Sequence, residues 1–335
     1  MIFCLLLILV FVFSCNPKVD VFEEWKDITV IYGLLNQSDS IQYIRVSKSF
    51  AGYGNSYDMA KVPDSFFYKP NTLVAYMEEW LNNKLNKIIE LKLDSTIKRN
   101  EGVFSNEKNY YFYTKEPLNA NATYKLFVKI KEKIVFSETN LIPGHNLVIT
   151  KQTTNSIVPV DNNYIKIDFT TPKLGKIYQC YLRFFYYEVF PNDTVKKYLD
   201  MLLYKGISQT TNGNEIISFS YPSISFYENL ANYIKETDNL LYRVVAKNAV
   251  QIIIYVGSQD LYAYMQSTEP TTSVVLDKPI FTNIKNGIGI FTSRYTKYGR
   301  IDSLTQRTVD SIAYSKYTKH LKFLDFYNSN WNVFN

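Results

Sequence analysis

The chain has 335 residues, of which 46% are hydrophobic and 16% aromatic, and its formal net charge is +6. Because its 37 Lys and Arg residues are interleaved with 31 Asp and Glu residues and form no basic stripe, the charge pattern argues against a nucleic-acid partner. The 29 Tyr and 22 Phe residues favour pleated sheet over helix, which predicts a mainly β protein.

The chain begins with an apolar run over residues 2–13, which is too short to span a bilayer and has the length of a secretory signal core. Ser14 directly precedes Cys15, and Val12 lies three positions before that cysteine. This pattern resembles the cleavage box of bacterial lipoproteins, whose cysteine becomes acylated and N-terminal. The resemblance implies a signal peptide over 1–14, a lipid on Cys15 that anchors the protein to a membrane, and a polar tether over 15–27. The alternative is an ordinary secreted protein.

The length predicts two domains. Removal of 14 residues leaves 335 − 14 = 321, at about 150 residues per domain. We expect an N-terminal domain over 28–143 and a C-terminal β-rich domain with short helices over 144–335, each large enough to bury its own core without a cofactor. Beyond the tether the only cysteine is Cys180, so the folded body has no intrachain disulfide, and we interpret Cys180 as an inert buried side chain.

In the first domain, turn residues separate short apolar runs that predict strands. The expected strands are 28–34, 41–46, 72–80, 86–93 and 134–139, with a turn at Asn82 and Asn83 between the third and the fourth. The segment 51–71 is rich in Gly and Pro and long for a loop inside a compact domain. It is either a ligand or partner loop, in which Tyr53 and Tyr57 would take part, or a decorated or mobile connection.

A strand that begins at Tyr124 carries apolar residues on alternate positions, and Leu118 lies six residues before that tyrosine. The spacing resembles the tyrosine corner of immunoglobulin-like and fibronectin-like sandwiches, in which the Tyr hydroxyl returns to the upstream backbone and pins the crossing between two sheets. We therefore expect a mainly β fold with two β-sandwich domains of this kind and a few short helices in the second.

In the second domain we expect strands at 147–150 and 164–169, a long hairpin of 177–190 with 194–204, and a strand or bent strand pair at 240–256. Helical spacing of apolar residues predicts helices over 223–237, 258–266 and 308–321, the first two with Ser223 and Ser258 near their N-caps.

The stretch 281–291 contains Asn286-Gly287, a strong hairpin turn, so we expect 281–284 to pair with 288–292. A phosphate-cradling loop is the alternative. A lone G-x-G with no third glycine, no lysine and no following helix is too weak to support it.

The same stretch carries a family resemblance. Asn283-Ile284 followed by Gly287, Gly289 and Phe291 resembles the C-terminal signature of a Bacteroidota lipoprotein family that is catalogued as a domain of unknown function. The resemblance implies an outer-membrane lipoprotein with sandwich domains, often encoded near TonB-dependent transporters. It implies no reaction.

Catalytic and metal-binding patterns are missing from the sequence. His145 and His320 have no neighbouring Cys and no second His at ligand spacing, and there is no G-x-S-x-G. Carboxylate pairs such as Glu78-Glu79 are adjacent and would point to opposite faces of a strand. We therefore expect no catalytic residue, metal or cofactor, and a secreted hydrolase is the least favoured function.

Binding is favoured by two aromatic runs, 110–113 and 184–187, because half of each run must point away from the core of a sheet. The candidate ligand or partner surface comprises Tyr53, Tyr57, Tyr111, Tyr113, Phe185 and Tyr187. The alternative is ordinary cross-strand pairing of aromatic side chains. We expect a lipid-anchored outer-membrane protein that helps a TonB-dependent transporter to capture a nutrient, with a glycan or a peptide as possible ligand. The alternative is a cell-surface adhesion or envelope scaffold protein.

Overall fold

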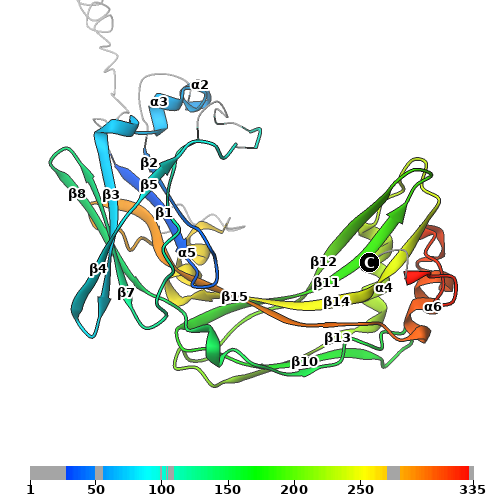
Figure 1. The fold of residues 1–335 in the computed structure, drawn as a ribbon. Helices are drawn as coiled ribbons and strands as arrows, with labels where there is room; N and C mark the ends of the chain where they lie inside the picture. Colours follow the sequence, from blue (N-terminus) through cyan, green and yellow to red (C-terminus); the bar gives the residue numbers. More distant parts are fainter. Residues whose placement is uncertain are drawn as a thin grey trace, which may run out of the picture.

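The computed structural model describes residues 28–49, 56–98, 100–102, 104, 109–269 and 280–331. The fold is mainly β, as the composition predicts, with an eight-stranded, a four-stranded and a three-stranded sheet in this part of the chain. Figure 1 shows two lobes: lobe one contains β1 to β8, and lobe two contains β9 to β14. The predicted leader, Cys15 and the tether to residue 27 lie outside the described residues.

Lobe one consists of two sheets that pack across one hydrophobic core. The first contains β1 (Thr29–Leu35), β2 (Gln42–Lys48), β5 (Lys92–Asp94) and β6 (Tyr111–Thr114). The second contains β3 (Leu73–Leu81), β4 (Lys84–Glu90), β7 (Thr123–Ile130) and β8 (Lys133–Asn140). The predicted turn between β3 and β4 is confirmed, since Asn82 and Asn83 adopt φ of 49° and 62°, which Asn tolerates better than most residues.

The predicted 51–71 loop contains local structure where it is described. It holds α2 (Ser56–Ala60), α3 (Pro63–Phe66) and the 3₁₀ turn η1 (Pro70–Thr72). Phe66 and Phe67 are buried, and Arg45 of β2 lies 5.3 Å from the centre of the Phe67 ring. This part of the loop is therefore packed on the body.

Tyr124 makes the contact expected of a tyrosine corner. Its side chain is fully buried, its hydroxyl accepts the N–H of Asn119 at 2.7 Å, and it donates to the carboxylate of Glu79. Leu118 packs against the same core. The chain crosses here from β6 in one sheet to β7 in the other, so the hydroxyl holds the crossing to the neighbouring strand β3.

The Tyr124→Phe substitution is expected to lower the free energy of unfolding by about 1–3 kcal/mol, because the carboxylate of Glu79 and the N–H of Asn119 lose a buried partner. Urea unfolding followed by circular dichroism measures the change. Tyr198→Phe is the matched control, because Tyr198 is 59% exposed. Equal stabilities of the two variants would contradict the role of the hydroxyl.

Lobe two also has two sheets around one core. Its longer strands are β11 (Gly175–Val189), β12 (Thr194–Ile207) and β14 (Tyr242–Ser258). The opposite sheet is β9 (Ile149–Gln152), β10 (Tyr164–Thr170) and β13 (Ile216–Pro222). The predicted long hairpin is confirmed as β11 and β12, and β14 is one strand with irregular pairing. Cys180 is fully buried among apolar side chains, as predicted, and burial raises the pKa of its thiol.

Three helices occupy the predicted regions: α4 (Ser223–Tyr233), α5 (Gln259–Thr268) and α6 (Gln306–Tyr314). The Ser258 cap is confirmed, since its hydroxyl accepts the N–H of Leu261 at 3.1 Å. The Ser223 cap is wrong: Pro222 is the N-cap residue, and Ser223 is buried inside the first turn. The predicted helix 308–321 ends at Tyr314, and a separate 3₁₀ turn, η3 (Lys319–Leu321), follows.

The strand β15 (Gly287–Asp302) belongs to both lobes. Its first seven residues, 287–293, pair in parallel with β1, and residues 294–302 pair antiparallel with β14. Ile284 and Phe291 are part of the core of lobe one. Residues from within the expected range 144–335 thus complete the sheet of the lobe formed by 28–143, and β15 continues from one lobe into the other (Figure 1).

The predicted hairpin of 281–284 with 288–292 is wrong. Asn286 does form a turn, with φ of 60°, but Lys285 pairs with Phe136 of β8, and 288–292 pairs with β1. The side chain of Asn283 takes the place of a strand, because its amide donates to the carbonyl of Phe291 at 2.8 Å and accepts the N–H of Phe291 at 3.0 Å. One side chain satisfies the backbone groups that a paired strand would have satisfied.

Gly287 and Gly289 permit the close approach of β15 to β1. A Cβ atom on Gly287 would lie 2.7 Å from the carbonyl oxygen of Thr29, and one on Gly289 would lie 2.1 Å from that of Ile31. Gly289 also has φ of +109°, which L side chains rarely adopt. Asn283, Gly287, Gly289 and Phe291 therefore all contribute to the geometry in which β15 pairs in parallel with β1.

Candidate functional site

Two of the predicted surface residues lie together in lobe one. Tyr111 and Tyr113 of β6 alternate with the buried Phe112 and point away from the core. The ring of Tyr43, on the neighbouring strand β2, lies 5.9 Å from that of Tyr111 and 6.1 Å from that of Tyr113. We call Tyr43, Tyr111 and Tyr113 the tyrosine cluster. Tyr43 is 37% exposed and the other two are half-buried, so the three rings pack against one another and each remains partly accessible to solvent.

The other predicted aromatic residues lie elsewhere. Phe185 and Tyr187 are half-buried on β11 in lobe two, where the ammonium group of Lys196 lies 5.6 Å and 5.9 Å from the two ring centres. Such cross-strand contacts fit the ordinary pairing that the sequence left open. Tyr57 of α2 is 64% exposed, and Tyr53 lies outside the described residues. The described residues of the predicted ligand or partner surface therefore do not form one continuous surface.

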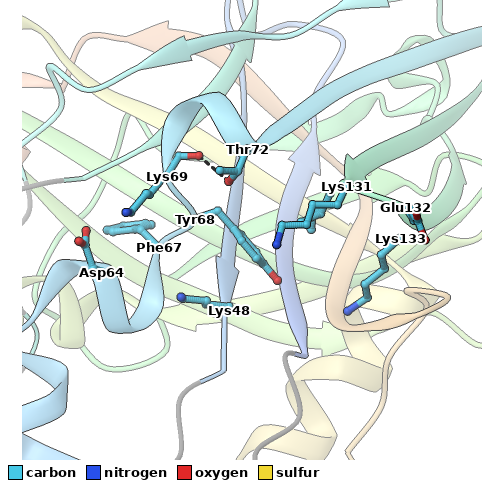
Figure 2. Close-up of a pocket in the computed structure, with 10 residues that line it drawn as sticks. Lys48, Asp64, Phe67, Tyr68, Lys69, Thr72, Lys131, Glu132 and Lys133 are labelled. Atoms are coloured by element: carbon cyan, nitrogen blue, oxygen red, sulfur yellow. Dashed lines mark hydrogen bonds between the residues drawn. The ribbon is translucent and has the colours of Figure 1, made fainter.

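A pocket of about 560 Å³ lies in lobe one beside the first residue of β1, and sequence reasoning missed it. Figure 2 shows the side chains that line it. They are Lys48, Asp64, Phe67, Tyr68, Lys69, Thr72, Ile130, Lys131, Glu132 and Lys133. We call this the lysine pocket. Four lysines and two carboxylates leave a formal excess of two positive charges on its walls.

Two hydroxyl groups lie at the pocket wall, that of the lining residue Tyr68 and that of its neighbour Thr29. Thr29 is fully buried, and its hydroxyl lies 3.0 Å from that of Tyr68 and accepts from the ammonium group of Lys133 at 3.1 Å. The ammonium group of Lys48 lies 5.8 Å from the centre of the Tyr68 ring. The buried Phe67 and Ile130 contribute apolar surface. The pocket thus combines cations with an aromatic and aliphatic wall.

The lysines of this pocket come from segments that no local pattern connects. Lys48 ends β2, Lys69 precedes η1, and Lys131 and Lys133 flank the turn between β7 and β8. Thr29 and Lys48 are direct partners across the β1–β2 ladder. Only the packing of α3 and the β7–β8 turn around that ladder brings the four lysines to the walls of one pocket.

Two tyrosine hydroxyls, those of Tyr178 and Tyr264, have raised pKa values. Burial raises the pKa of Tyr178 to about 12. Burial, together with the hydrogen bond to Tyr32 on β1, raises the pKa of Tyr264 on α5 well above its usual value. Both hydroxyls therefore remain protonated at neutral pH, and that of Tyr264 donates a hydrogen bond to Tyr32.

Neither histidine lies in a ligand cluster. His145 is exposed in the short turn η2 (Gly144–Asn146), which follows β8, and His320 is exposed in η3. Within the described ranges, no group of three or more His, Cys, Asp or Glu side chains is close enough to hold a metal ion. No helix in those ranges has the length and apolar character needed to cross a membrane.

Comparisons with known proteins leave the family open. No known family model matches the chain, and no curated protein does so either. Among solved structures, the C-terminal globular domain of an oligosaccharyltransferase from Pyrococcus abyssi is similar with 14% identity and a TM-score of 0.24, over 68% of this chain and 47% of that one. A cytokine receptor complex is similar with 6% identity and a TM-score of 0.22, over 83% of this chain and 96% of that one. This chain thus spans about half the length of the first of these structures.

Proposed function

We propose that this protein is a lipid-anchored binding protein of a bacterial outer membrane, attached through Cys15, and that it assists a TonB-dependent transporter in nutrient capture. The anchor rests on the order Val12, Ser14, Cys15 after an apolar run of signal length. The body acts by binding and performs no reaction of its own.

The observation that carries the binding role is the tyrosine cluster. Tyrosine is enriched at protein interfaces, because its ring buries a large area and its hydroxyl tolerates water. In this cluster the rings already contact one another, at 5.9 Å and 6.1 Å between centres, so docking would immobilise few side chains. The partner that fits is a folded protein surface, and in this proposal it is the transporter.

The architecture in this proposal is two immunoglobulin-like sandwich domains. Two sheets around a single core in each lobe, and the crossing that Tyr124 holds in lobe one, support it. β15 would then be a strand shared between the two domains.

The test measures how much transporter co-purifies with the tagged full-length protein from solubilised outer membrane, for the parent and for each variant. The Tyr43→Ser/Tyr113→Ser variant is expected to recover at most about one tenth of the transporter that the parent recovers, which corresponds to a loss of about 1.4 kcal/mol of binding. Tyr233→Ser is the matched control, because Tyr233 is 63% exposed on α4 in lobe two. Equal recovery by the cluster variant would reject the tyrosine cluster as the docking surface, and no transporter with the parent would reject the partnership.

The continuous strand β15 favours a second candidate, a cell-surface adhesion or envelope scaffold protein. A strand that is hydrogen-bonded in both lobes resists bending better than a flexible linker, which suits a spacer. A deletion strain with normal attachment and envelope integrity but poor growth on one nutrient would reject this candidate.

A further inference from the structure

The walls of the lysine pocket carry more positive than negative charge. Within the described part of the chain, Lys48, Lys69 and Lys131 make no ion pair, although other lysines, such as Lys61 and Lys87, do. The two carboxylates of the pocket lie toward its edges in Figure 2, Asp64 beside Phe67 and Glu132 on the turn beyond Lys131. Between them, the ammonium groups of Lys131 and Lys133 lie on one side of Tyr68 and that of Lys48 on the other.

The contacts inside the pocket indicate which anion fits. Lysine is a point charge that binds phosphate oxygens, and the hydroxyl of Tyr68 provides a further polar group on the same wall. The volume of about 560 Å³ exceeds what a bare phosphate needs and lies within the range of small-molecule sites. Phe67 and Ile130 offer apolar contact to the organic part of such a molecule.

We propose that the lysine pocket is a binding site for an organic phosphate, with Lys48 and Lys131, on either side of Tyr68, as the groups that hold the phosphate. Two sources share this chemistry, the headgroup of an anionic phospholipid and a soluble phosphorylated compound. The headgroup source rests on the proposed anchor. The N–H of Ile28, which precedes β1, donates a hydrogen bond to the hydroxyl of Ser49, the residue that follows Lys48. Cys15 lies 28 − 15 = 13 positions before Ile28. The phosphate site itself does not depend on the anchor.

The experiment measures binding to the full-length protein in neutral detergent by isothermal titration calorimetry. The probes are glycerol phosphate, short-chain phosphatidylglycerol and short-chain phosphatidylcholine. Glycerol phosphate is expected to bind with a Kd below about 1 mM, and its affinity is expected to fall as salt is added. The Lys48→Gln/Lys131→Gln variant is expected to bind roughly 25-fold more weakly, which corresponds to two lysines at about 1 kcal/mol each.

Two control variants separate charge from folding. Lys48→Arg/Lys131→Arg keeps both charges and is expected to retain binding within about threefold, since a change of that size is under 1 kcal/mol. Lys166→Gln/Lys247→Gln removes two exposed lysines of lobe two and is expected to bind as the parent does. The thermal unfolding midpoint of each variant shows whether it is folded.

If phosphatidylglycerol binds and glycerol phosphate displaces it, the result supports the site and identifies a phospholipid headgroup as the ligand. Binding of glycerol phosphate alone supports the site and identifies a soluble ligand. Absence of binding for both phosphates, equal binding of phosphatidylcholine, or undiminished binding by the folded Gln variant overturns the proposal. The mass of the amino end tests the anchor separately, so an unmodified Cys15 together with phosphate binding would reject the anchor and keep the site.

Discussion

The Gly289→Ala substitution is expected to lower the free energy of unfolding by at least about 3 kcal/mol, or to prevent lobe one from folding. The added Cβ would lie 2.1 Å from the carbonyl oxygen of Ile31, a backbone atom that cannot turn aside as a flexible side chain can. The φ of +109° would be strained for alanine even without that clash. The two effects act on the same ladder, the parallel pairing of β1 with β15.

Urea unfolding monitored by far-UV circular dichroism measures this loss, and native mass spectrometry shows whether the variant is folded. Gly102→Ala is the matched control, because a Cβ there meets no heavy atom within 4 Å and φ lies outside the positive range. A Gly289→Ala variant that unfolds within about 0.5 kcal/mol of the parent, the usual spread for harmless surface substitutions, would show that β1 and β15 do not approach this closely.

The Arg243→Met substitution is expected to destabilise lobe two by about 3–5 kcal/mol, because it leaves the carboxylate of Glu188 buried without its cation. Arg243 is 1% exposed and Glu188 is 5% exposed, and the guanidinium donates to that carboxylate at 2.8 Å and 3.0 Å. It also donates to the carbonyls of Leu321 and Lys235, at 2.8 Å each. One side chain thus ties β14 to β11, to the segment after α4 and to η3.

A double-mutant cycle separates the ion pair from the other contacts. Arg243→Met/Glu188→Met is expected to lose less than the sum of the two single losses, since the double variant buries no unpaired charge. Arg183→Met is the control at a partly exposed pair. Arg183 donates to the carboxylate of Asp200 at 2.7 Å, the two side chains are 22% and 30% exposed, and the substitution should cost about 1 kcal/mol or less. Additive losses at Arg243 and Glu188 would mean that their direct contact contributes little.

Much of the local structure could be predicted from neighbouring residues. The Asn82-Asn83 turn, the return of the Tyr124 hydroxyl to the backbone of Asn119, and the Ser258 cap each depend on residues at most five positions apart. Alternation of apolar side chains identified β7, because a strand with one face in a core shows that period in its sequence. Ser223 failed as a cap because tertiary packing buries it in the first helical turn.

The candidate sites were less predictable. Tyr111 and Tyr113 were identified from the alternation of their strand, but their partner Tyr43 lies on β2, far away in the sequence. Phe185 and Tyr187 satisfy the same pattern and lie on the other lobe. The lysine pocket has no sequence pattern, since its walls come from three separate segments, at residues 48, 64–72 and 130–133.

The sequence by itself determined the β-rich composition, most strand and helix positions, the turns, and the pattern around Cys15 on which the anchor proposal rests. Only the tertiary structure decided that β15 pairs with β1 in place of a local hairpin, that Arg243 meets Glu188, and that four lysines surround one pocket. The physical reason is the sequence separation of the groups that interact. Turns and caps depend on hydrogen bonds between residues a few positions apart. The edge of a strand can pair with many segments, and the packing of the whole molecule determines which segment pairs with it.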